Sequence, residues 1–457
     1  MSEGRSFTIR TALIVALGGF LMGIDASVIS GVVGFIELEF ALNKLELGWS
    51  VASLALAATF AMLVAGPLSD RFGRKPVLRL AAILFAVSAL ASAMAPSFTA
   101  LVGARIIGGL GVGMALIIAP MYIAEISPAA QRGRMVSLNQ LNIVIGISVA
   151  FFSNYLILKL GQSQADWALT LRLEEWNWRW MLGLETAPAL LYFLCLYLVP
   201  ESPRWLLMQG RQEEALATMS RVSNPEQAVR EIETIDASLA TDRNIQTHKP
   251  HLATLFSKPM RLVLSIGLTV AILQQITGIN SVFFYAPMIF EQSGIGTDAS
   301  FMQAILVGLT NLVFTLLAIV LIDRIGRKPL LIFGVAGIAM CMMLLAWGFD
   351  AATYTLSEQA ITTLPAAIDR SLLDPLVNIT FTSDIGFTQA LGDSLGKAKY
   401  QEFEADLLSA AITINPNLIL MGILGFVACF AISIGPVSYT HPDAADDQWS
   451  VGVGGGG

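Results

Sequence analysis

The chain has 457 residues, of which 55% are hydrophobic and 13% are charged, and its formal net charge is −7. Soluble domains carry about 25% charged residues, so the composition excludes an ordinary soluble domain. It indicates an all-α membrane protein that crosses the bilayer several times. We expect no nucleic-acid partner.

The cysteines and histidines restrict the possible chemistry further. Cys195, Cys341 and Cys429 all lie inside apolar runs, which argues against a disulfide framework and against a cysteine-rich metal site. We interpret them as small packing residues. His248 and His251 lie close together in a polar segment without other ligand residues nearby. The sequence therefore predicts no metal site, and it contains no nucleophile and base pair that would indicate an enzyme.

Ten apolar runs are long enough to cross about 30 Å of hydrocarbon. They are residues 11–35, 48–68, 77–95, 100–123, 136–159, 180–199, 261–290, 301–322, 330–348 and 416–436. Lys and Arg gather in alternate connections, after the second, fourth and eighth runs. By the positive-inside rule these connections and the N-terminus face the cytoplasm. We therefore expect a multi-pass protein of the plasma membrane, which in a bacterium is the inner membrane.

One polar stretch occurs twice, and it reveals an internal duplication. Residues Leu68–Leu78 return as Leu321–Leu331, with eight of eleven positions identical. Both copies lie between apolar runs, so each is predicted to be a tight turn between two membrane helices. Gly in the turn permits an unusual backbone conformation, and Pro suits the first turn of the next helix.

Two longer polar segments divide the chain. Residues 200–260 have mixed charge and helical stretches, and we interpret them as a cytoplasmic linker between an N-terminal bundle, 1–199, and a C-terminal region, 261–436. Residues 349–415 form a second insertion, placed outside by the span count. The insertion holds nine acidic and three basic residues, so it carries most of the net negative charge.

The C-terminal end departs from the pattern. The apolar run stops after Pro436, and residues 437–457 are polar and then rich in glycine. A duplication of six plus six spans would need two more runs. We therefore expect that the reading frame is lost near Val437, that residues 437–457 are not native, and that the second bundle is truncated.

A buried charge pair is the first candidate site. Asp25 lies near the middle of the first run and Arg105 lies in the fourth. Charged groups inside a span are costly, about 2.5 to 3.5 kcal/mol on insertion scales, so they are functional candidates by default. A carboxylate balanced by an arginine can take up a proton when the arginine moves away. The alternative is a static buried ion pair.

Neutral amides inside the spans form the second candidate. They offer paired donors and acceptors without charge, which suits a ligand with many hydroxyl groups. Gln274 and Gln275 differ by about 100° around one helix, so both reach the same ligand only by flanking it. The alternative is hydrogen bonding between helices. The candidate amides are Gln140, Asn142, Gln274, Gln275, Asn280 and Asn311.

Charges at the predicted inner face form the third candidate. Such charges can bridge helix ends, and bridges between the two halves must break when a transporter opens inward. We interpret them as latches of a cytoplasmic gate, with helix capping and topology signalling as the alternative. The residues are Asp70, Arg71, Gly73 and Arg74 in the first repeat, Asp323, Arg324 and Arg327 in the second, and Glu125, Arg132, Glu201 and Arg204 elsewhere.

Four motifs together resemble the sugar porter family of the major facilitator superfamily. The motifs are Gly66–Lys75, Arg105–Gly113, Pro200–Trp205 and Gln274–Asn280. The resemblance implies the major facilitator fold, which has two six-helix bundles. About ten of these spans are present here. It also implies alternating access and a monosaccharide bound midway between the halves.

The same resemblance assigns residue roles. It implies that Gln140, Gln274, Gln275, Asn280 and Asn311 bind the sugar, and that Tyr285 remains from an aromatic pair whose first member is replaced by Phe284. Asp25 occupies a position that is acidic in the family's proton symporters and usually an amide in its uniporters, with Arg105 as its partner.

The substrate is less sharply defined. Met22 and Ile147 depart from the pattern of bacterial xylose carriers, so a hexose and a pentose both remain open. The expected protein is a monomeric importer in the lipid bilayer, driven by the proton gradient without a bound cofactor. A facilitative uniporter and a sugar sensor that does not transport are the alternatives.

Overall fold

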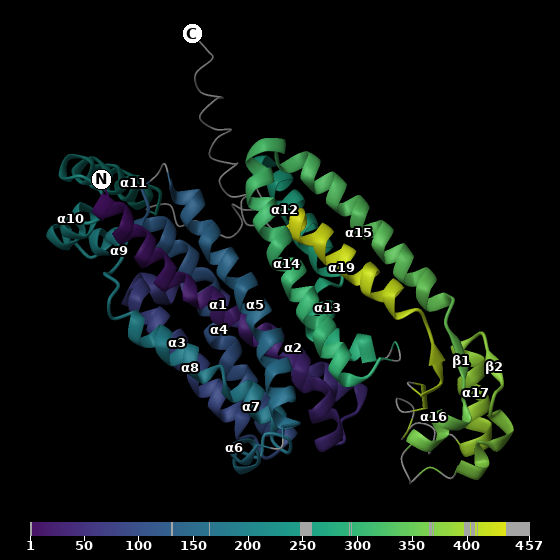
Figure 1. Cartoon of the computed structure of the whole chain (residues 1–457). Helices are drawn as coiled ribbons and strands as arrows, with labels where there is room; N and C mark the ends of the chain where they lie inside the picture. Colours follow the sequence, from purple (N-terminus) through teal and green to yellow (C-terminus); the bar gives the residue numbers. More distant parts are fainter. Residues whose placement is uncertain are drawn as a thin grey trace. The chain divides into compact units, whose positions relative to one another are not determined.

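The protein is helical over most of its length, as predicted. The computed structural model describes residues 2–128, 131–163, 165–246, 258–291, 293, 295–364, 368, 370–396, 403, 407–408 and 410–435. Among these residues, eight helices are long and apolar enough to cross a membrane. Internal contacts divide the chain into two units, one that ends at Gly278 and one that comprises Ile279–Gly435 (Figure 1). The predicted non-native tail, 437–457, and the pair His248 and His251 lie outside the described residues.

Five long helices form the body of the first unit. They are α1 (Ser2–Glu39), α2 (Lys44–Phe72), α3 (Arg74–Ala93), α4 (Phe98–Ile126) and α5 (Arg132–Gly161). Helix α4 is central, because it packs against α1, α2, α3 and α5. A Cβ atom at Gly109 would lie 2.3 Å from the carbonyl oxygen of Leu54, so α4 touches the backbone of α2. The glycines of α4 thus allow close helix packing.

The sixth predicted run is not one continuous helix. It is divided into α7 (Asn177–Gly183) and α8 (Thr186–Cys195), preceded by the short α6 (Asp166–Thr170). Pro188 has no N–H group and cannot donate a hydrogen bond to the carbonyl of Leu184, four residues earlier. The hydropathy of 180–199 identified the apolar run but carried no information about this break.

Three shorter helices follow in the first unit, where the sequence predicted a helical linker. They are α9 (Pro203–Met208), α10 (Gln212–Ser220) and α11 (Pro225–Gln246), and they share a small apolar core. The guanidinium group of Arg221 lies 4.4 Å from the ring centre of Phe7, so the connection after α10 packs against α1. Figure 1 shows these helices beside the N-terminal end of α1. Helix α12 (Lys258–Ile276) completes the unit.

Four helices build the membrane part of the second unit. They are α13 (Ile279–Glu291), α14 (Thr297–Ile325), α15 (Arg327–Asp350) and α19 (Pro416–Ile432). Helix α19, the tenth predicted run, packs against α13, α14 and α15. Helix α13 is kinked at Tyr285, whose φ of −125° and ψ of 16° are not helical. Pro287 in the same helix cannot donate a backbone hydrogen bond, which accounts for a kink in this turn.

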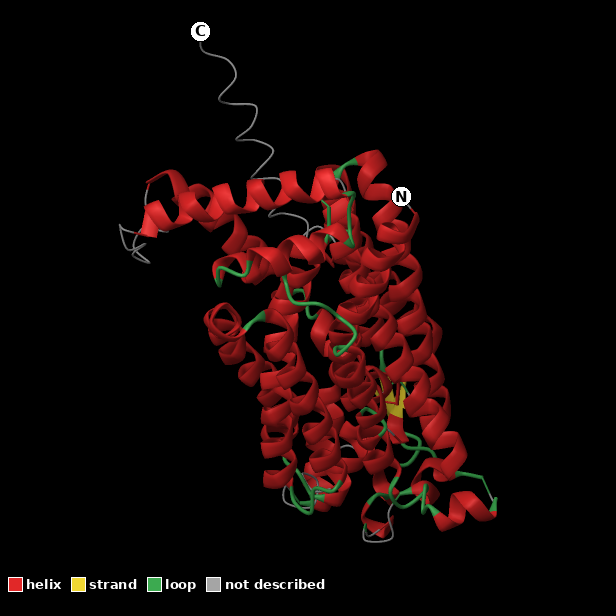
Figure 2. Cartoon of the chain, turned by 90° about the vertical axis from the view of Figure 1, so that its left-hand side faces the viewer, coloured by secondary structure: helices red, strands yellow, loops and turns green. Residues whose placement is uncertain are grey.

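The insertion between α15 and α19 folds into a small domain with its own core. Its elements are β1 (Thr353–Thr355), α16 (Glu358–Thr363), the 3-10 turns Arg370–Leu372 and Asp374–Leu376, β2 (Thr380–Phe381), α17 (Asp384–Leu395) and β3 (Ile412–Thr413). The strands pair antiparallel in the order β2-β1-β3, with Tyr354 opposite both Phe381 and Ile412. The side chains of Leu356, Phe387 and Leu391 are fully buried. Figure 2 shows this small sheet in an otherwise helical chain. The sequence predicted a polar insertion but not its fold.

Candidate functional site

The first unit buries the predicted charge pair. Asp25 on α1 is 4% exposed and Arg105 on α4 is 2% exposed. Nη1 of Arg105 lies 3.5 Å from Oδ1 of Asp25, and Nε of Arg105 has no hydrogen-bond partner among the described residues. The pair is therefore buried and joined by one long contact. A buried charge is expensive unless it is paired and hydrogen-bonded, so this pair remains a candidate functional site.

Glu185 is a third member of this site that the sequence interpretation missed. It lies at the break between α7 and α8, it is buried, and it interacts electrostatically with both Asp25 and Arg105. Its Oε1 has no partner in the described part of the chain. A signal was available, because Glu185 is an acidic residue inside the apolar run 180–199, and the rule that selected Asp25 applies to it equally.

Glycine and serine shape the other side of Asp25. A Cβ atom at Gly108 on α4 would lie 3.3 Å from Oδ2 of Asp25 and 2.5 Å from Oγ of Ser88. Ser88 on α3 donates its hydroxyl hydrogen bond to the carbonyl of Ala104, at 2.8 Å. Helices α1, α3 and α4 thus meet at the carboxylate, and glycine at position 108 leaves room for it.

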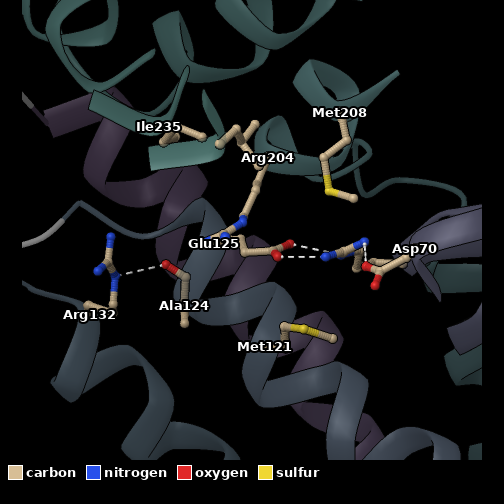
Figure 3. A pocket seen from close by; sticks show the side chains of 10 residues that line it. Asp70, Met121, Ala124, Glu125, Arg132, Arg204, Met208 and Ile235 are labelled. Atoms are coloured by element: carbon tan, nitrogen blue, oxygen red, sulfur yellow. Dashed lines mark hydrogen bonds and ion pairs between the residues drawn. The ribbon is translucent and has the colours of Figure 1, made fainter. Parts of the chain in front are cut away.

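Arg74 is the centre of the predicted inner-face charges of the first unit. Its side chain is 3% exposed. Nε and Nη2 donate to the two carboxylate oxygens of Glu125 on α4, at 3.1 and 2.9 Å, and Nη1 donates to Asp70 on α2 at 2.9 Å (Figure 3). A bidentate arginine–carboxylate pair is among the strongest charged hydrogen bonds. Ser202 also donates to Glu125, which extends the cluster to the start of α9.

Glu201 caps the N-terminus of α3. Its carboxylate accepts hydrogen bonds from the backbone N–H groups of Arg74, at 3.1 Å, and Lys75, at 3.3 Å, and from the N–H of Ser202 at 2.9 Å. Burial raises the pKa of Glu201, while these backbone hydrogen bonds act in the opposite direction. These hydrogen bonds favour the carboxylate form because the first turn of a helix presents unpaired N–H groups and a partial positive charge, whereas burial has the larger, opposite effect.

Gly73 allows the cap to form. Its φ of +103° is a conformation that side chains rarely adopt, and a Cβ atom there would lie 2.6 Å from Oε2 of Glu201. The turn glycine of the repeat is therefore needed both for its backbone angle and for the approach of a carboxylate.

Three further predicted residues of this group make different contacts. Nε of Arg132 donates to the carbonyl of Ala124 at 3.0 Å, and the guanidinium of Arg71 lies 5.2 Å from the ring centre of Phe72. A cavity of about 630 Å³ lies between these helices and the linker helices. It is lined by Asp70, Arg74, Met121, Ala124, Glu125, Arg132, Arg204, Met208, Ile235 and Leu239. Figure 3 shows Arg204 reaching toward Glu125 from the linker side.

The second copy of the repeat has the same backbone but different surroundings. Gly326 has a φ of +88°, and a Cβ atom there would meet no heavy atom of the described residues within 4 Å. Arg324 is exposed. The side chains of Asp323 and Arg327 lie outside the described residues. The two turns are therefore alike in backbone conformation, while in the described part of the chain only the first has a carboxylate against its glycine.

The predicted sugar-binding residues are divided between the two units. Gln140 on α5 and Gln274 on α12 are half-buried and Gln275 is exposed. In the second unit, α13 carries Asn280 and Tyr285, and α14, which packs against α13, carries the buried Asn311. Their role in binding remains a prediction.

These features define a class of protein. The class is a helical membrane transporter of the major facilitator superfamily. Its features here are long apolar helices with buried charges in one bundle, a duplicated basic turn and a helical linker. The structure matches the partially occluded, inward-open xylose transporter XylE from E. coli with a TM-score of 0.70 and 31% identity, covering 96% of this chain and 87% of that one. The fold prediction is confirmed.

The family follows from sequence comparison. The family described as "Sugar (and other) transporter" matches residues 11–366, and the chain belongs to this family. It is 37% identical over 348 residues to the arabinose-proton symporter of Bacillus subtilis, covering 76% of this chain and 72% of that protein. It is 38% identical over 371 residues to the D-xylose-proton symporter of Escherichia coli K12, covering 75% and 72%. The chain is thus a multi-pass sugar transporter and not an enzyme.

Proposed function

We propose that this sugar transporter imports a monosaccharide together with a proton, by alternating access. The observation that carries the proposal is the buried pair of Asp25 and Arg105 in the first unit. Relatives named as proton symporters for arabinose and xylose support the same assignment. The energy source is the proton gradient, with no bound cofactor.

The coupling step is a change in the charge of the buried site. A proton that reaches Asp25 from outside removes one negative charge and weakens its attraction to Arg105. Glu185 interacts electrostatically with both groups, so its charge state is coupled to theirs. Arg105 is then less strongly held by Asp25 within a low-dielectric site, where charge interactions are strong. This change favours closure around bound sugar.

The substrate is a hexose or a pentose, bound by the neutral amides and Tyr285. Amides recognise hydroxyl groups without the desolvation cost of a charge. The relatives include carriers named for arabinose, xylose and glucose, so they support a monosaccharide without selecting one.

The charges around Arg74 serve as the cytoplasmic gate in this proposal. Asp70, Arg74 and Glu125 join the ends of α2, α3 and α4 into one block. Such a block moves as a rigid body during alternating access. The protein resides in the bacterial inner membrane with its N-terminus in the cytoplasm, which agrees with the basic residues that gather in alternate connections.

The decisive experiment replaces Asp25 with Asn in the full chain, reconstituted in proteoliposomes. Asn is isosteric with the protonated carboxyl but cannot release a proton. We expect Asp25→Asn to lose accumulation of labelled sugar against a gradient and to retain counterflow exchange. Asp166→Asn, an exposed carboxylate on α6, is the matched control and should keep both activities.

The other outcomes separate the alternatives. Accumulation that persists in Asp25→Asn and still depends on pH would remove Asp25 from the coupling step. Wild-type protein that equilibrates sugar but never concentrates it would identify a facilitative uniporter. Sugar binding without any flux in the wild type would identify a sensor.

A further inference from the structure

Two of the three cysteines meet in the second unit. Cys341 lies on α15 and Cys429 lies on α19. Both are free and half-buried, and their thiol groups are hydrogen-bonded to each other. Nothing in the transport mechanism uses them.

The helix seam explains why the thiols approach. Helices α15 and α19 run antiparallel, since Gly334 faces Ser433 at one end and Gly348 faces Leu418 at the other. Side chains on a helix tilt toward its N-terminus. In an antiparallel pair, Cys341 and Cys429 therefore lean toward each other along the seam.

Glycines opposite the cysteines bring the backbones close. A Cβ atom at Gly337 on α15 would lie 2.5 Å from Sγ of Cys429, and one at Gly425 on α19 would lie 2.8 Å from Sγ of Cys341. Each sulfur thus fills the space left by a glycine on the other helix. The two sulfurs therefore lie in the packed seam between the helices.

Both helices also carry exposed side chains. Met340, Met343 and Met421 on the same helices are 64%, 64% and 69% exposed. Cys341 and Cys429 lie in apolar stretches of α15 and α19, where reagents confined to water have poor access. The oxidant must therefore be one that dissolves in the bilayer.

We propose that Cys341 and Cys429 form a redox-active dithiol that closes to a disulfide between α15 and α19 when a lipid-soluble quinone oxidises it. Two S–H bonds break and one S–S bond forms. The two electrons and two protons pass to the quinone, which leaves as the hydroquinone. The second sulfur is already in contact with the first, so closure is intramolecular and has a high effective concentration.

The disulfide would join the two helices that bracket the small domain. Helix α15 leads into this domain and α19 leads out of it. A covalent link at this seam therefore closes a loop that contains the whole domain, and loop closure restricts the unfolded chain. The site is independent of the proposed proton coupling.

The test counts free thiols in the full chain in liposomes. The protein is treated with tetramethyl-1,4-benzoquinone, which has no free ring position for thiol addition, then denatured in SDS and labelled with a maleimide-polyethylene glycol. Untreated protein should carry three adducts and oxidised protein one. Dithiothreitol should restore three. Cys195→Ser is the matched control and should change from two adducts to none.

The variants locate the bond. Cys341→Ser and Cys429→Ser should each keep both remaining adducts after oxidation. Gly337→Ala, which displaces the sulfur of Cys429, should slow the loss of adducts at least tenfold. Three adducts on oxidised wild type would overturn the proposal. Loss of labelling at Cys195, or a disulfide between two chains on a non-reducing gel, would overturn it as well.

Discussion

Replacement of Gly73 by Ala tests how the first repeated turn is built, and the duplication supplies its own control. Gly73 and Gly326 have the same place in the repeat and similar backbone angles, φ +103° with ψ 158° and φ +88° with ψ 163°. An added methyl group at Gly73 would lie 2.6 Å from Oε2 of Glu201, whereas one at Gly326 would meet no heavy atom of the described residues within 4 Å. Both substitutions introduce the same backbone strain, but only Gly73→Ala also places a methyl group against the carboxylate of Glu201.

The expected magnitudes follow from these contacts. A side chain in this backbone region costs about 1–3 kcal/mol, so both variants lose about that much unfolding free energy. At Gly73 the carboxylate of Glu201 must also move away from the N–H groups of Arg74 and Lys75. Hydrogen bonds to a charged group contribute about 1.5–3 kcal/mol. Gly73→Ala should therefore lose about that much more unfolding free energy than Gly326→Ala.

The assay is unfolding of purified protein in mixed micelles with increasing SDS, followed by circular dichroism. A double-mutant cycle with Glu201→Ala isolates the contact. Once Glu201 is absent, Gly73→Ala should cost no more than Gly326→Ala. Equal losses for the two single glycine variants, or coupling between Gly73 and Glu201 below about 0.5 kcal/mol, would refute the reasoning.

Two other predictions use the same unfolding measurement. Gly109→Ala places a methyl group 2.3 Å from the carbonyl oxygen of Leu54, and such overpacking costs about 1–3 kcal/mol. Gly103→Ala on the same helix meets no described atom within 4 Å and should stay within about 0.5 kcal/mol, so equal effects would contradict the packing of α4 on α2. Burial raises the pKa of Glu201, so the carboxyl group of Glu201 binds its proton more tightly in the folded chain than in the unfolded chain. Its contribution to stability is full below the ordinary pKa of about 4.3 and is lost as the pH rises through the raised value. The unfolding free energy of wild type minus that of Glu201→Gln should therefore fall as the pH rises through that window. A difference that increases with pH would contradict the prediction.

Much of the candidate site was predictable because charged residues are rare inside the apolar runs of a membrane protein. Asp25 and Arg105 are conspicuous in apolar runs, and the structure brings them to 3.5 Å. The repeated turn indicated that Asp70 and Arg74 form a charged unit, and both are hydrogen-bonded. Glu185 was equally conspicuous and was overlooked.

Other features depended on contacts between segments far apart in the chain. Glu125 pairs with Arg74 and not with Arg132, which lies only seven residues away. The core of the small domain forms from apolar residues spread through a polar segment. No local sequence pattern predicts such pairings, because they depend on which segments of the folded chain lie next to each other.

The sequence by itself determined the class of protein, the apolar runs, the duplication and the residue types at the buried charge pair. These follow from local physics, since apolar length and the cost of a charge in lipid are properties of each segment alone. The tertiary structure decided the partners: Glu125 with Arg74, Glu201 on the first turn of α3, and Cys341 against Cys429. Such contacts arise only when packed helices bring distant residues within a few ångströms, where glycine permits the approach.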